Sequence, residues 1–105
     1  MGWIYLALAG AFEIVWATAM KQSDGFSRIV PTVVTAVFLL ASLGLLSVAM
    51  RTLPLGTAYA VWTGIGALGA LGVGILLFDE PASLFRLASA GLILAGIVGL
   101  KLATP

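Results

Sequence analysis

Four long apolar segments, separated by short polar ones, dominate the pattern of this 105-residue chain. Segments 29–50 and 52–78 contain no charged residue, and each is longer than the roughly 20 residues that a helix needs to cross a bilayer. The first segment, 2–20, contains one acid, and the last, 82–100, contains Arg86 near its beginning. We therefore predict a single transmembrane domain over residues 1–105, with helices at 2–21, 29–50, 55–78 and 84–102.

The composition changes this picture only by excluding other classes of protein. Hydrophobic residues make up 62% of the chain and charged residues 9%, whereas soluble domains carry roughly 25% charged residues. The predicted fold class is therefore an all-α membrane protein with the lipid bilayer around it. The chain has no cysteine and no histidine, which excludes disulfides and thiolate metal sites. A net charge of +1 gives no indication of nucleic acid, and we predict no cofactor, metal or nucleic-acid partner.

The basic residues are almost evenly divided between the two membrane faces. Short loops make consecutive helices antiparallel neighbours, so Arg51 and Lys101 share one face, while Lys21, Arg28 and Arg86 share the other. The positive-inside rule needs an excess of basic residues to choose an orientation. Two interpretations stay open. The chain has one weakly fixed orientation, or it inserts in both and forms an antiparallel homodimer, comparable to the inverted repeats of transporters.

A strip of small residues runs along the fourth predicted helix. Gly91, Ala95 and Gly99 follow one another at a spacing of four, and Gly96 lies beside them. Such strips let helix backbones approach closely in a membrane. The strip predicts close packing of this helix, either between two copies of the chain or within one copy.

Glu13 is the charged residue that lies in the middle of a predicted span. A charge at that depth costs a few kcal/mol or more, so it is interpreted by default as a functional site that faces a cavity or a partner. On a helix it shares one face with the small residues Ala9, Gly10 and Ala17, and Trp16 follows one turn later. The simpler alternative is a structural hydrogen bond to a neighbouring helix.

Three further side chains could contribute to a cation site. Ser42 lies in the middle of the second span, and Tyr59 and Trp62 share a strip on the third. Aromatic faces attract cations, and the polar tips of Tyr and Trp need partners when buried. The simpler interpretations are a helix–helix hydrogen bond for Ser42 and packing for Trp16 and Trp62. A carboxylate among such groups can hold either a proton or a cation, as a proton-coupled antiporter requires.

Glycines are frequent in the third span, and residues 64–69 match G-x-G-x-x-G by letter. A dinucleotide site needs a strand before this motif and an acid at a defined distance after it. The chain offers neither. We interpret these glycines as positions of close packing in a helix that can bend.

Taken together, these residues resemble the small multidrug resistance family along the whole chain. The motifs are EIVWA at 13–17, MK at 20–21, GF at 25–26 and LPLGTAYAVWTGIG at 53–66, and they are similar to the guanidinium-exporting subtype. Trp16 is the discriminating position, because quaternary-ammonium exporters typically have glycine there. The segment GLILAGIVG at 91–99 resembles the dimerisation segment of the family.

The resemblance implies an antiparallel, dual-topology homodimer in the bacterial inner membrane that exchanges protons for guanidinium or substituted guanidinium cations. It assigns proton and substrate binding to Glu13 and places Trp16, Ser42, Tyr59 and Trp62 around the carboxylate. The alternatives are an exporter of quaternary ammonium or other hydrophobic cations, a small dual-topology ion channel, and an assembly subunit without transport of its own. An enzyme is not predicted, since the chain has no nucleophile–base set and no metal cluster.

Overall fold

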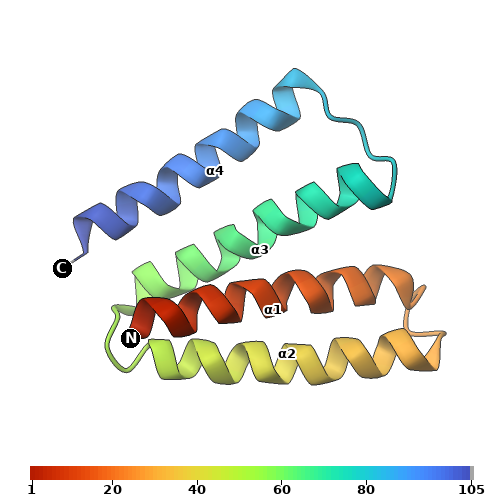
Figure 1. The fold of residues 1–105 in the computed structure, drawn as a ribbon, viewed down its shortest axis with the longest axis horizontal. Helices are drawn as coiled ribbons and strands as arrows, with labels where there is room; N and C mark the ends of the chain where they lie inside the picture. Colours follow the sequence, from red (N-terminus) through yellow and green to blue (C-terminus); the bar gives the residue numbers. More distant parts are fainter. Residues whose placement is uncertain (105) are drawn as a thin grey trace.

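The computed structural model describes residues 1–104. Its helices are α1 (Gly2–Gln22), α2 (Ile29–Ala49), α3 (Leu55–Leu77) and α4 (Leu84–Ala103) (Figure 1), and the described residues contain no strand. Each of the four helices is long and apolar enough to cross a membrane, which confirms the predicted all-α class. Each helix end lies within one residue of its predicted position.

The loop between α1 and α2 turns the chain back through local hydrogen bonds and left-handed residues. The backbone N–H of Ser23 donates to the carbonyl of Ala19 at 2.9 Å, and the Ser23 side chain is fully buried. Asp24, Gly25 and Phe26 then have φ values of 50°, 70° and 67°. This left-handed run reverses the chain and places α2 antiparallel to α1.

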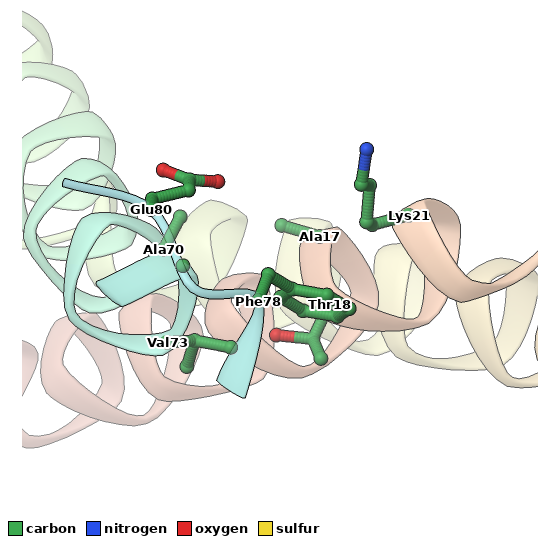
Figure 2. A pocket seen from close by; sticks show the side chains of 8 residues that line it. Ala17, Thr18, Lys21, Ala70, Val73, Phe78 and Glu80 are labelled. Carbon is green, nitrogen blue, oxygen red and sulfur yellow. The ribbon is translucent and has the colours of Figure 1, made fainter. Parts of the chain in front are cut away.

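The helices lie side by side in the order α2, α1, α3, α4 (Figure 1). The Cα extents of 43 × 34 × 16 Å describe a flattened arrangement of helices. The central helices α1 and α3 run parallel, because a complete hairpin separates them in the chain. Toward their C-terminal ends they leave a cavity of about 160 Å³ between them (Figure 2).

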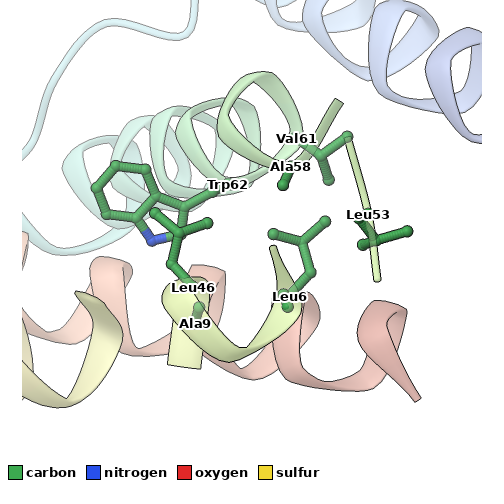
Figure 3. Packing of buried hydrophobic residues seen from close by; sticks show 8 residues of the cluster. Leu6, Ala9, Leu46, Leu53, Ala58, Val61 and Trp62 are labelled. Atoms are coloured by element: carbon green, nitrogen blue, oxygen red, sulfur yellow. The ribbon is translucent and has the colours of Figure 1, made fainter. Parts of the chain in front are cut away.

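The buried core lies in the half of the layer where α1 begins and α2 ends (Figure 3). It contains Leu6, Ala9, Leu46, Ala49, Leu53, Ala58, Val61 and Trp62. The alanines allow the helices to approach closely, which matters in lipid because van der Waals packing, not the removal of apolar surface from water, holds membrane helices together. The core therefore fixes the rotation of α1 and determines which of its residues face α3.

The outer helix α4 has no buried residue. Ile93 and Ile97 pack against Gly64 of α3, and the hydroxyls of Thr57 and Thr104 lie 3.2 Å apart. On the other faces of α4, an added Cβ at three glycines would meet no atom within 4 Å. These are Gly91, Gly96 and Gly99. These three glycines of the small-residue strip therefore have no neighbour from another helix of the same chain at the position of a Cβ.

Candidate functional site

Glu13 lies on the face of α1 that packs against α3, and its carboxylate lies directly on Gly66. A Cβ at Gly66 would overlap the carboxylate, so the glycine creates the space that the acid occupies. The side chain is partly buried, and its Oε1 atom is buried without a hydrogen-bond partner among residues 1–104. A buried acceptor without a donor is costly. This position therefore favours a proton or a cation that can donate hydrogen bonds.

A hydrogen-bonded chain joins α1, α2 and α3 one turn before Glu13. The Trp62 indole N–H donates to the Ser42 hydroxyl at 3.0 Å, and that hydroxyl donates to the carbonyl of Ala9 at 2.6 Å. In an α-helix, the Ala9 carbonyl is also the acceptor of the Glu13 backbone N–H. Ser42 thus makes the helix–helix bond that its mid-span position indicates. Neither Ser42 nor Trp62 makes a direct hydrogen bond to the Glu13 carboxylate, so they position α1 through its backbone.

Tyr59 extends this group of residues toward the exposed side of α3. Its ring lies 5.5 Å from the Trp62 ring, centroid to centroid, at an interplanar angle of 50°. Tyr59 is 54% exposed, whereas Trp62 is 7% exposed. The tryptophan is held by its hydrogen bond to Ser42, while the tyrosine ring can change rotamer without breaking that bond.

Trp16 lies on α1 three residues after Glu13 and is partly buried. Its indole Nε1 is buried and has no hydrogen-bond partner in the described part of the chain. An unpaired donor on Trp16 and an unpaired acceptor on Glu13 therefore lie about one turn apart on the same helix. The two groups are complementary in hydrogen bonding, and the indole face can also attract a cation.

Comparison with known proteins identifies the family of this chain. The family described as "Small Multidrug Resistance protein" has a sequence model that matches residues 1–93. This chain belongs to the small multidrug resistance family. A relative from Yersinia pseudotuberculosis is 58% identical over 104 residues, covering 99% of this chain and 100% of the relative. Relatives from Citrobacter freundii and Salmonella typhimurium are also 58% identical and cover 99% of both chains. All three are named guanidinium exporter.

The family and the four apolar helices together make this small multidrug resistance protein a multi-pass integral membrane protein of the bacterial inner membrane. The family resemblance drawn from the motifs is thereby confirmed. The relatives' name describes a transporter, which is not an enzyme.

Two features of this small multidrug resistance protein were missed by sequence reasoning. Gly66 was assigned to close packing in general, and its contact with Glu13 was not predicted. The cavity near the C-terminal ends of α1 and α3 was not predicted either, and Lys21, which lies on its wall, was assigned to no site from the sequence. The sequence contained one indication of where this cavity lies. Glu13 and Lys21 are eight residues apart, as are Gly66 and Gly74 on the parallel helix, so Lys21 and Gly74 both lie about two turns beyond the Glu13–Gly66 contact.

Proposed function

We propose that this chain is a proton-coupled antiporter that exports guanidinium-type cations, with protons and substrate competing for Glu13. The proposal is supported by the name shared by relatives that are 58% identical along almost the whole chain. One observation in the structure carries it. The Oε1 atom of Glu13 is buried at mid-span and has no donor among the described residues. A proton or a donor-rich cation would each satisfy this oxygen, and the two would exclude each other.

The same oxygen favours guanidinium over a quaternary ammonium ion. Guanidinium groups are planar and carry several N–H donors that match a carboxylate, and these charge-assisted bonds are about twice as strong as neutral ones. A quaternary ammonium ion carries no N–H group and would leave Oε1 unsatisfied. Trp16 would add an aromatic face to the site, and the Ser42–Trp62 bond would hold α1 in register.

Purified protein in proteoliposomes with an acidic interior is expected to take up guanidinium while protons leave down their gradient. Each proton that Glu13 releases to the outside frees its carboxylate for the cation. Uptake is measured with labelled guanidinium, and proton movement with a trapped pH indicator. A quaternary ammonium ion of similar size serves as the comparison substrate. Strong transport of that ion without guanidinium transport would refute the proposal, as would guanidinium flux that moves no protons.

We further propose that two copies pair as an antiparallel homodimer through α4. The support is the open strip of Gly91, Ala95, Gly96 and Gly99, which faces away from the contacts of α4 with α3. Glu13 is partly exposed in the flattened arrangement of one chain, and a second copy would cover it. The nearly equal count of basic residues on the two faces is compatible with insertion in both orientations.

Substitution of Gly91 with leucine is expected to lower the dimer fraction, because the larger side chain keeps two α4 backbones apart. The control is Gly44→Leu on α2, where the glycine also has open space around it. Dimerisation is measured by energy transfer between differently labelled chains that are mixed in liposomes. The chain contains no cysteine, so a single Ala103→Cys label has no background.

The same Ala103→Cys variant tests the orientation of the helices. Reaction with an impermeant maleimide from both sides of the membrane is expected if both orientations occur. Labelling from one side alone would contradict the antiparallel arrangement. Equal energy transfer in Gly91→Leu and Gly44→Leu would contradict the role of the α4 strip.

A further inference from the structure

A second carboxylate lies at the rim of the cavity between α1 and α3. The cavity, about 160 Å³ in volume, is lined by Ala17 and Lys21 from α1 and by Ala70 and Gly74 from α3. Glu80, in the loop that follows α3, completes the wall (Figure 2). This acid is separate from the Glu13 site and has no role in the mechanism described so far.

The cavity lies one helix turn beyond the contact between Glu13 and Gly66. Because α1 and α3 are parallel, residues spaced by four on each helix meet in successive layers. Ala17 and Ala70, one turn beyond Glu13 and Gly66, both line the cavity. The next turn brings Lys21 and Gly74, which lie about 12 Å along the helices from the Glu13 level. The cavity therefore begins one turn from Glu13 and opens at the membrane face where α3 ends.

The local backbone directs Glu80 back onto the end of α3. Asp79 has a φ of 56°, which reverses the chain after the helix. The backbone N–H of Glu80 then donates to the carbonyl of Gly74 at 3.1 Å. The Glu80 carboxylate covers Gly74 so closely that a Cβ there would lie 2.5 Å from Oε1. The position of the acid is thus defined by α3, although the acid belongs to a loop.

Glu80 already binds a guanidinium group. The Nη2 atom of Arg86 lies 2.9 Å from Oε1 of Glu80, and both side chains are partly exposed. Only one N–H···O contact joins them among the described residues, so the carboxylate retains positions for further donors. An exposed ion pair of this kind contributes less than about 1 kcal/mol. Because the pair is this weak, Arg86 leaves the Glu80 carboxylate for part of the time, and a free guanidinium ion can then form the same contact.

We infer that Glu80 is a peripheral guanidinium site at the mouth of the α1–α3 cavity, where a free guanidinium cation exchanges with the Arg86 side chain on its way to or from Glu13. This inference rests on the proposed function, because it places the site on the route of a transported guanidinium ion. Arg86 acts as a tethered competitor that occupies Glu80 when no substrate is present. Lys21 on the facing wall repels the cation and limits how long it stays.

Transport kinetics distinguish a guanidinium site at Glu80 from a purely structural role, in which the Glu80–Arg86 ion pair only holds the loop in place. At low ionic strength, Glu80→Gln is expected to raise the KM for guanidinium about two- to fivefold, the range of an exposed ion pair, and to change kcat less. Arg86→Gln is expected to lower KM by a similar factor, because it removes the competitor. A purely structural ion pair predicts that KM changes in the same direction in both variants, since each variant breaks the same pair. The matched control is Asp79→Asn, which removes the same charge one residue away and retains a residue type that tolerates positive φ.

A second readout does not depend on transport. Guanidinium chloride is titrated into the full-length protein at non-denaturing concentration while the side-chain NMR signal of Arg86 is observed, with sodium chloride at equal ionic strength as the control. Movement of the signal toward its position in Glu80→Gln, with guanidinium alone, supports the exchange. An unchanged signal, KM shifts of the same sign in both variants, or equal effects of Glu80→Gln and Asp79→Asn would overturn it. Absence of wild-type guanidinium transport would instead refute the proposed function, while the titration still reports on Glu80.

Discussion

Replacing Glu13 with glutamine is expected to abolish proton-driven guanidinium transport, with a loss of about 100-fold or more in binding. Glutamine keeps the shape of the side chain but removes the charge, and loss of one partner of a buried charge pair costs about 2–5 kcal/mol. In the wild type, guanidinium binding should weaken as the pH falls, because protons occupy the same carboxylate. In the variant, the residual binding should not depend on pH. Calorimetric titration across a range of pH, together with liposome uptake, measures both effects.

The control for Glu13→Gln is Asp24→Asn, which makes the same acid-to-amide change in an exposed loop and should leave transport intact. Glu13→Asp keeps the charge on a shorter side chain and should retain proton-linked transport at a lower rate. Guanidinium flux that survives in Glu13→Gln and moves no protons would contradict the antiporter mechanism. That result would favour the small ion channel, which needs no titrating acid.

The helix positions were predictable because lipid imposes a simple rule on the chain. A backbone without water around it must form helices long enough to span the bilayer, and the charges of this sequence mark where each helix has to end. Arg86 illustrates the rule, because this charge lies in the first turn of α4, close to the N-cap residue Ser83. The Arg86 side chain forms its ion pair with Glu80 in the loop before the helix. The position of Glu13 and Ser42 in the middle of their spans was also enough to identify them as candidate site residues.

The neighbours of these residues could not be predicted in the same way. Periodicity shows which residues share a helix face, but not which other helix covers that face. The contact of Glu13 with Gly66 depends on α1 lying between α2 and α3, and the open strip on α4 depends on the packing of Ile93 and Ile97 against Gly64. Both follow from side-chain shape across a layer of helices. The roles of Trp16, Ser42, Tyr59 and Trp62 around a bound cation stay predictions.

Alanine at Gly66 is expected to remove most transport while the four-helix fold persists. The new Cβ would occupy the position of the Glu13 carboxylate, so either the acid is displaced or α1 and α3 move apart. Misplacement of a critical group by about 1 Å can cost about 100-fold, and we expect a loss of about tenfold to 100-fold here. Circular dichroism and thermal unfolding in detergent check that the helices are retained.

The same substitution at Gly72 provides the control, because Gly72 lies on the same helix and an added Cβ there meets no atom within 4 Å. Alanine is the better helix former by about 1 kcal/mol, so Gly72→Ala should be as stable as the wild type or slightly more stable, with normal transport. A second substitution that restores space for the acid gives a sharper test of the Glu13–Gly66 contact. Glu13→Asp shortens the acid by one methylene, so the double variant with Gly66→Ala should lose less than the two single losses combined. Strict additivity, or normal transport by Gly66→Ala, would show that the Glu13–Gly66 contact is not part of the working site.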